Sequence, residues 1–319
     1  MTMLAFRSGL PVPRPLLLVL ALALAAPAAN PGAAQSVSPA EVPVAVIVND
    51  PSNAFWFTEG VLAKRAAQRL GYQVTVYAHS GDVITERDLI RRAIDNDAVA
   101  VLLDPAHRLN SRDAVQTAMD QGVRVLVLNA PIERGMTAGQ FGADNLSCAR
   151  RSAAAFARLM GDTGRYVQLD GPTRDANATL RAQGFASVLD SRPGLERVRS
   201  INGQWSRETS YTELKALVAE GVRFDGIIAA NDEMALGALE AVRDEIWAKD
   251  LVIGGFDGSP DALRAIELGT LSYTVVQPLE ELTSAAVAEM DRQVRGLDGG
   301  GYRNDLRLFG CDLVETEPH

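Results

Sequence analysis

The chain has very little histidine or cysteine, with three His and two Cys among 319 residues. A structural zinc site takes four such ligands, so this composition argues against a metal centre. The chain also lacks the glycine-rich G-x-G-x-x-G and Walker phosphate loops, the G-x-S-x-G nucleophile elbow and the H-E-x-x-H zinc motif. Its formal net charge of −9 opposes nucleic-acid binding, which needs a basic surface. We therefore expect no cofactor, no metal and no nucleic-acid partner.

Long apolar runs are also absent, apart from one near the N-terminus. There, two arginines precede an uninterrupted apolar run over 16–26, and small residues follow. This order is typical of a secretory signal, and the run is shorter than the ~20 residues that span a bilayer. We predict a signal peptide over 1–34, cleaved near Ala34, with Ala28 as the alternative site and a short anchor or leader as the alternative interpretation. Cleavage removes two arginines, so the mature net charge is −9 − 2 = −11.

The two cysteines, Cys148 and Cys311, are too far apart for a CxxC motif. In an oxidising compartment an even pair favours a disulfide over a redox site. Two buried free thiols are the alternative.

From residue 44 onward, short apolar runs alternate with amphipathic stretches. The predicted strands lie over 44–48, 73–77, 99–103, 123–128, 166–169, 198–201, 226–229, 252–255 and 272–276, with the last ones within 305–314. The predicted helices lie over 55–70, 84–94, 111–121, 146–160, 179–189, 208–219, 233–242, 261–268 and 279–295. Continuous apolar strands interleaved with helices indicate parallel sheets covered on both faces. The strands are too many for one compact sheet, so we predict an α/β fold of two doubly wound lobes.

In such sheets ligands bind beyond the carboxyl ends of the strands. Amides, acids, arginines and aromatic rings follow the predicted strands there, among them Asp104, Asp170, Asp175, Asp232 and the residues assigned below. Planar amides, carboxylates and guanidinium groups each make two hydrogen bonds to neighbouring hydroxyls, and rings cover C–H faces. This chemistry suits a sugar or polyol. Taken singly, each polar residue is as easily a helix cap or turn former.

Two segments carry a family resemblance: Asn-Asp-Glu-Met-Ala-Leu-Gly-Ala-Leu at 231–239 and Val-Ile-Gly-Gly-Phe-Asp-Gly at 252–258. They resemble the signatures of the ribose-binding group of type I periplasmic binding proteins, and the similarity extends over about 44–314. The resemblance implies a periplasmic protein that captures a monosaccharide or sugar alcohol between two lobes. It further implies delivery to a membrane ABC permease by a monomer without enzymatic activity.

The same resemblance implies a ligand set. Its members are Asn53, Phe55 and Trp56 (matching Asn-Pro-Phe-Phe), Asn129, Arg181, Trp205 with Arg207 (matching Phe-x-Arg), Asn231, Asp257 and Gln277. One departure stands out, because ribose binders carry Asp-Arg where this chain has Asn129-Ala130. The lost arginine argues against ribose and favours another pentose, a hexose, a deoxysugar or a sugar alcohol.

The family's three-crossing hinge is expected near 143–144, 277–278 and 310–312. It would divide the chain into an N-terminal lobe, 43–143 plus 278–310, and a C-terminal lobe, 144–277 plus 311–319. Cys148 and Cys311 both fall close to this hinge, and we predict that they form a disulfide.

Three other functions are weighed against transport. A ligand-presenting subunit for a chemoreceptor or sensor kinase would share fold and ligand. A transcriptional regulator would need a basic helix-turn-helix before the ligand domain, where this chain has a signal peptide. An exported carbohydrate-active enzyme would need two carboxylates across a scissile bond with room for water, whereas a site enclosing one monosaccharide holds no leaving group.

Overall fold

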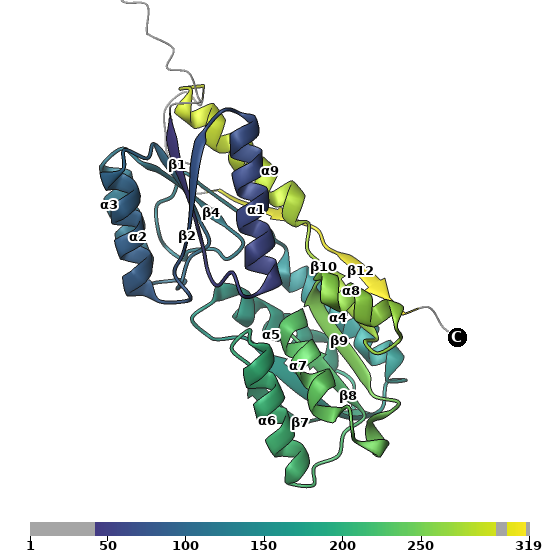
Figure 1. Cartoon of the computed structure of the whole chain (residues 1–319). Coiled ribbons are helices and arrows are strands. Elements are labelled where there is room, and N and C mark those ends of the chain that lie inside the picture. The colour runs from purple at the N-terminus through teal and green to yellow at the C-terminus, as the bar shows by residue number, and fades with distance from the viewer. Residues whose placement is uncertain (1–41, 298–304, 317–319) are drawn as a thin grey trace, which may run out of the picture. The chain divides into compact units, whose positions relative to one another are not determined.

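The computed structural model describes residues 42–297 and 305–316, and the predicted signal peptide lies outside them. Two six-stranded sheets, each flanked by helices, form the core of this part of the chain (Figure 1). None of the described helices combines the length and apolar character needed to cross a membrane. The strands are mostly parallel, as the sequence predicts.

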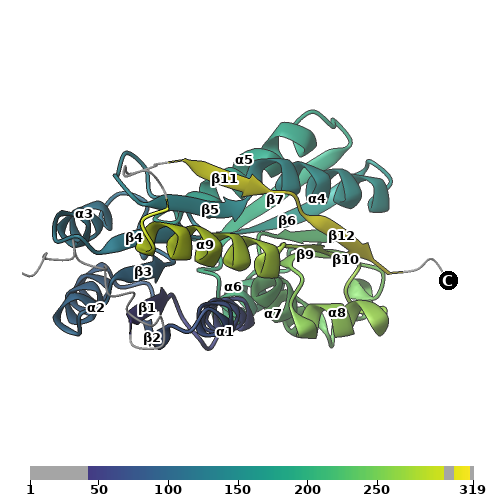
Figure 2. The same ribbon diagram turned by 90° about the horizontal axis from the view of Figure 1, so that it is seen from above.

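The first sheet has the strand order β11-β5-β4-β3-β1-β2. Its strands are β1 (Pro43–Val48), β2 (Gln73–Ala78), β3 (Ala100–Leu103), β4 (Arg124–Leu128), β5 (Gly139–Ala143) and β11 (Leu306–Phe309), all parallel. Helices α1 (Ala54–Arg69) and α9 (Leu279–Val294) cover one face, and α2 (Val83–Asp95) and α3 (Arg112–Asp120) cover the other (Figure 2). Because both faces are covered, every residue of β3 is buried.

The second sheet has the order β12-β10-β9-β8-β6-β7. Its strands are β6 (Gly164–Asp170), β7 (Leu195–Asn202), β8 (Gly226–Ala229), β9 (Val252–Asp257), β10 (Tyr273–Val276) and β12 (Asp312–Glu315). Helices α4 (Asn145–Leu159) and α5 (Ala176–Leu189) lie on one face. On the other lie α6 (Arg207–Ala219), α7 (Asp232–Val242) and α8 (Pro260–Glu267), with the 3₁₀ turn η2 (Ile246–Ala248) after α7 (Figure 2).

Two details differ from the sequence predictions. Strand β5 was not predicted, because its sequence, Gly-Gln-Phe-Gly-Ala, has low β propensity. Glycine is needed within it, since a Cβ at Gly142 would lie 2.6 Å from the backbone oxygen of Asn129. Strand β12 is antiparallel to β10, whereas the sequence predicts only parallel pairing. The chain leaves the second sheet at the end of β10 and returns to it at the start of β12, so the two strands run in opposite directions.

The disulfide between Cys148 and Cys311 is confirmed, with an S–S distance of 2.05 Å. It joins α4 to the connection between β11 and β12, where the chain passes from one sheet to the other. The Arg151 guanidinium of α4 donates to the Cys311 carbonyl, and the Asp144 N–H before α4 donates to the Phe309 carbonyl at 2.8 Å. Two of the connections between the sheets are therefore bound to each other.

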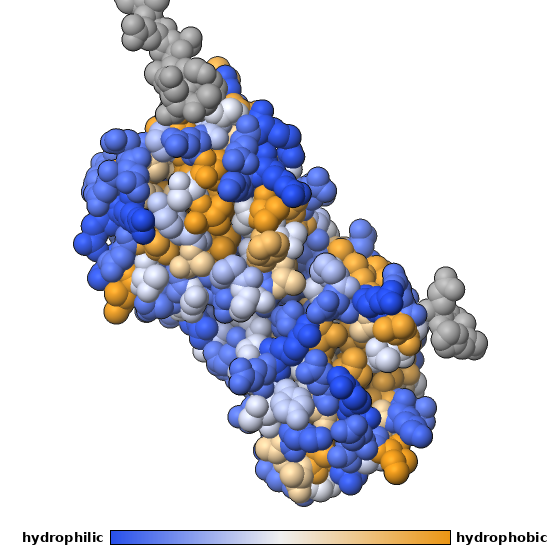
Figure 3. Space-filling model, in the orientation of Figure 1, coloured by the Kyte–Doolittle hydropathy of each residue, from blue (hydrophilic) through white to orange (hydrophobic). Residues whose placement is uncertain are grey.

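The surface is mainly hydrophilic on the face shown in Figure 3, with separate apolar areas between the charged ones. Exposed apolar side chains such as Phe57 on α1 and Ile246 in η2 occur on different elements. Scattered apolar residues of this kind are normal for a folded protein and call for no interpretation.

Candidate binding cavity

A cavity lies where residues from the carboxyl ends of both sheets meet, and its free volume is only about 20 Å³. This volume is far below the ~300–1,000 Å³ of pockets for drug-sized ligands, so the lining side chains must move apart to admit a ligand. The residues that line it are Asn53, Phe55, Trp56, Asn129, Asp175, Asn177, Arg181, Trp205, Asn231, Asp257 and Gln277. Nine of the ten predicted ligand residues are among them, together with Asp175 and Asn177, which were not assigned.

Three of the lining residues are also helix caps. Asn53, Asp175 and Asn231 are the N-caps of α1, α5 and α7, and each accepts a backbone N–H with its side-chain oxygen. A cap uses only the amide oxygen of an asparagine, so its NH₂ group remains available. Both asparagines donate this group to the carbonyl of Trp205, at 3.3 and 3.5 Å. The structural and functional interpretations of these residues are therefore compatible.

Aromatic rings enter the cavity from both sheets. Phe55 and Trp56 come from the first turn of α1, and Trp205 comes from the loop after β7. The indole N–H of Trp205 donates to the Asp175 carboxylate at 3.0 Å. Gly171 gives this ring its space, because a Cβ there would lie 2.3 Å from the indole. Rings that line a cavity in this way can cover apolar faces of a ligand.

Arg181 on α5 is the cation of the cavity, and its side chain is only 4% exposed. It donates to the Asn145 side chain at 2.7 Å, the Ala230 carbonyl at 2.6 Å and the Asp257 carboxylate at 3.3 Å. Its guanidinium also lies 3.8 Å from the centre of the Phe256 ring. Burial lowers the pKa of Arg181, and the charge of Asp257 opposes that shift. These partners already neutralise and orient the guanidinium.

Asp257 and Gln277 form the adjoining wall. Burial raises the pKa of Asp257 to about 7, against the opposing effect of the Arg181 charge. The Gln277 NH₂ donates to Asp257 at 2.7 Å, whereas the buried Gln277 Oε1 has no hydrogen-bond partner among the described residues. A buried acceptor without a donor costs about 1–3 kcal/mol. A ligand hydroxyl that donates to Gln277 Oε1 would remove this cost.

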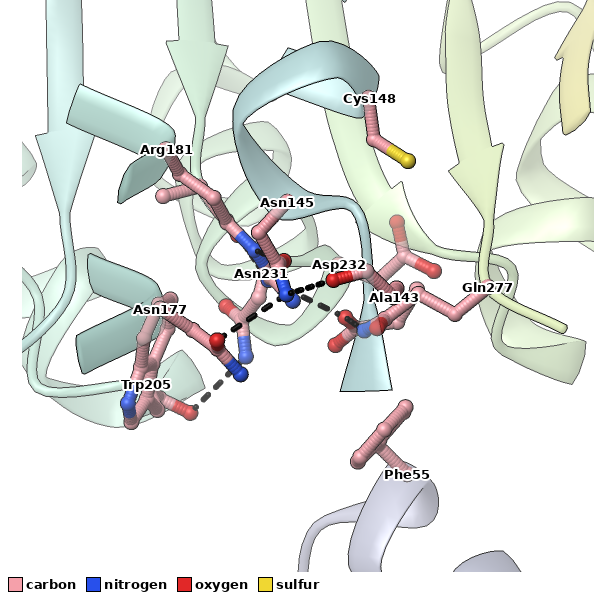
Figure 4. Close-up of polar contacts among 12 residues, drawn as sticks. Phe55, Ala143, Asn145, Cys148, Asn177, Arg181, Trp205, Asn231, Asp232 and Gln277 are labelled. Atoms are coloured by element: carbon pink, nitrogen blue, oxygen red, sulfur yellow. Dashed lines mark hydrogen bonds and ion pairs between the residues drawn. The ribbon is translucent and has the colours of Figure 1, made fainter. Parts of the chain in front are cut away.

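A row of amides crosses the cavity from one sheet to the other. Asn145 donates to Asn177 at 3.0 Å, Asn177 donates to Asn129 at 3.0 Å, and Asn129 donates to Asp104 at 3.0 Å. Figure 4 shows Asn145 with its contacts to Arg181, Asn177 and the Ala143 carbonyl. Asn177 belongs to the second sheet's helices and Asn129 follows β4 of the first, so their bond joins the two halves.

A buried acid pair lies behind this row. Burial, and then the charge of Asp104, raise the pKa of Glu59 well above its usual range. Burial, followed by the charge of Asp175, raises the pKa of Asp104 to about 8. The adjacent His79 is buried; its Nδ1 accepts the Gly81 N–H, so its Nε2 carries the proton that it donates to the Asp104 carbonyl. Burial lowers the pKa of His79, consistent with this neutral form.

Three residues that line the cavity have a strained backbone. Asn129, Trp205 and Asp257 have positive φ angles of 57°, 61° and 128°. Asparagine tolerates the left-handed region, but tryptophan and aspartate at such angles cost on the order of 1–3 kcal/mol each. Strain of this kind persists where the surrounding structure fixes it, and it is typical of binding sites.

Arg207, the tenth predicted residue, does not line the cavity. It begins α6, and its guanidinium donates to Glu233 on α7 at 2.8 Å and to Asp261 on α8 at 3.0 Å. It borders a neighbouring, larger cleft. Its contact with a ligand stays a prediction that its position does not favour.

The chemistry of the cavity suits a neutral ligand with several hydroxyls. Its one cation is already paired, so an anion would find no unused charge, and its acids would repel an anion. Its amides and acids can donate to and accept from hydroxyls, while its rings cover apolar faces. Within 42–297 and 305–316, no group of His, Cys, Asp and Glu is placed to hold a metal ion.

Comparisons with known proteins agree with this geometry. The model of the periplasmic binding protein domain matches residues 44–298. The D-apiose import binding protein of Actinobacillus succinogenes is 31% identical over 86% of this chain and 88% of its own length. The ribose import binding protein RbsB of Haemophilus influenzae is 27% identical over 83% and 89%. This chain belongs to the periplasmic binding protein family.

A solved structure shows the same fold. A periplasmic solute binding protein of an ABC transporter from A. succinogenes, with bound D-allose, superposes with a TM-score of 0.80 at 20% identity. It covers 87% of this chain and 98% of its own. The predicted two-lobed α/β fold and the predicted family are thus confirmed.

Proposed function

We propose that this protein captures one small, neutral, polyhydroxylated molecule, a monosaccharide or sugar alcohol, and delivers it to an ABC importer. The observation that carries this proposal is the lining of the cavity, in which amides, acids and aromatic rings from both sheets surround a paired arginine. The relatives support it, because they are named as import binding proteins for sugars. We further propose that the segment 1–34 exports the chain to the periplasm, where it binds without chemical turnover.

Capture works by closure in this proposal. We assign an N-terminal lobe to 43–143 plus 278–310 and a C-terminal lobe to 144–277 plus 311–319, because β1–β5 and β11 share one sheet and β6–β10 and β12 the other. The cavity takes residues from both, so a ligand that contacts both lobes stabilises their closed arrangement. The ligand contacts are proposed for Asn53, Phe55, Trp56, Asn129, Arg181, Trp205, Asn231, Asp257 and Gln277.

A thermal-shift screen of the mature protein tests the proposal. The panel should contain D-apiose, D-ribose, D-allose, xylitol, myo-inositol and, as an anionic control, ribose 5-phosphate. A ligand at a hundredfold excess over its Kd adds about 2.7 kcal/mol to the unfolding free energy, a shift of several degrees. We expect one neutral compound to stabilise the protein and the phosphate to fail. Preference for the phosphate, or no response to any neutral compound, would refute the proposed ligand class.

Titration calorimetry with the best compound and the variant Gln277→Leu then tests the site itself. The unpartnered Oε1 should receive a ligand hydroxyl, so its loss should weaken binding by at least about tenfold. Thr117→Leu on the outer face of α3 is a control outside the cavity. Equal affinities of both variants and the wild type would place the ligand elsewhere.

A further inference from the structure

The row of side chains across the cavity has a fixed direction. Arg181 can only donate, so the Asn145 oxygen must face it and the Asn145 NH₂ must face Asn177. The Ala143 carbonyl, which can only accept, is a second partner of the same NH₂ at 3.1 Å and fixes the same orientation. The Asn177 oxygen is thereby occupied, and its NH₂ turns to Asn129. Every hydrogen bond in the row therefore points in the same direction, from donor to acceptor.

The row ends at a carboxyl group. The Asn129 oxygen accepts from Asn177, so its NH₂ remains as donor for Asp104 Oδ2 at 3.0 Å. Asp104 accepts here whether or not its other oxygen carries a proton. The chain thus runs from a guanidinium through three amides to an acid, and each bond polarises the next. Within a low-dielectric interior such a chain is stronger than its separate bonds.

Only one link of this chain passes between the sheets. Arg181, Asn145 and Asn177 are on α5 and α4, while Asn129 and Asp104 follow strands β4 and β3. Other contacts pass between the same two halves, such as the Arg108 N–H to the Arg174 carbonyl at 2.9 Å. The hydrogen bond from Asn177 to Asn129 differs from these contacts because it joins two side chains. The orientation of each amide is fixed by a partner within its own half, independently of the bond between them.

We propose that Asn177 is a positioning residue that latches the closed arrangement by completing this head-to-tail chain. It acts through Asn129, and its contribution to closure needs no ligand. The proposal rests on the proposed function only in assuming that the two halves open and close.

The isosteric change Asn177→Asp tests the latch. Aspartate still accepts from Asn145 but has no hydrogen for Asn129, and its charge faces the Asn129 oxygen. The exposed Asn110→Asp adds the same charge away from the cavity and is the matched control. Small-angle scattering of the ligand-free proteins should show a larger radius of gyration for Asn177→Asp than for the control and the wild type. Identical scattering of all three would overturn the proposal.

Affinity for the saccharide found by screening gives a second readout. Asn177→Asp should bind it about tenfold or more weakly. Weakened binding with unchanged scattering would overturn the latch, because Asn177 would then act as a direct ligand contact. If no saccharide binds even the wild type, the proposed function fails while the scattering comparison still decides on the latch.

A double-mutant cycle guards against misfolding of the charged variant. Asn177→Ala and Asn129→Ala each cut the same link, so the second change should have little further effect on the radius of gyration. Additive effects of the two alanines would contradict the shared link. Far-UV circular dichroism should be the same for all variants.

Discussion

Loss of the disulfide should destabilise the fold by a large and calculable amount. The bond between Cys148 and Cys311 closes a loop with a sequence separation of 163 residues. In the loop-entropy model, a crosslink over that length lowers the entropy of the unfolded chain by an amount worth about 5 kcal/mol at 25 °C. For about 280 residues unfolding together, an entropy of ~2.1 cal/mol/K per residue converts this into a fall in Tm of about 8 °C.

Differential scanning calorimetry of the wild type with and without reductant, and of Cys148→Ala/Cys311→Ala, would measure the effect. The reduced wild type keeps both sulfur atoms, so it separates the loss of the crosslink from the loss of side-chain packing. We expect the reduced wild type and the double variant to melt at similar temperatures, and the double variant to ignore reductant. A fall of less than about 1 kcal/mol in the reduced wild type would refute the entropic argument.

Three further changes have defined outcomes. Asp257→Asn leaves the buried Arg181 without its counter-charge and should lower the unfolding free energy in urea by about 3 kcal/mol; a change below ~1 would mean that the carbonyl and amide partners suffice. Asp104, whose pKa burial raises to about 8, holds a proton in the folded state that the unfolded state releases near pH 4. Stability should therefore fall by up to ~1.4 kcal/mol per pH unit between about pH 4 and 8 and then level off, and Asp104→Asn should flatten this slope in denaturation series from pH 5 to 9. Gly171→Ala should push the adjacent indole out of place and weaken saccharide binding more than tenfold in calorimetry, while Gly310→Ala, where a Cβ meets nothing within 4 Å, should bind normally.

Most of the cavity could be predicted from the sequence because topology alone locates it. Apolar runs identify the parallel strands, and the carboxyl ends of such strands share one edge. Asp257 and Gln277, for instance, directly follow or end strands β9 and β10, so their place in the cavity follows from the strand order. The unpredicted β5 did not disturb this, since no lining residue follows it directly.

For Arg207, strand order alone does not predict the surroundings of the side chain. It lies two residues after Trp205, and the sequence treats the two as a pair. The helix that begins at Arg207 turns its side chain toward acids on α7 and α8, which come together only in the folded protein.

Asn177 is the opposite case. In the sequence it is an ordinary residue in the first turn of a helix, and its importance comes from a partner on the other sheet.

The amide at position 129 now has an explanation that does not involve the ligand. The sequence comparison with ribose binders treats Asn129 as a sign of changed specificity. In the structure its NH₂ donates to Asp104, and its oxygen accepts from Asn177. An aspartate at 129 would keep an acceptor for Asn177, but it would lose the NH₂ group that donates to Asp104 and set a second acid against that residue, which is already buried beside Glu59. An acid at 104 thus favours an amide at 129 whatever sugar is bound, so Asn129 does not argue against ribose, and only the missing arginine at Ala130 does.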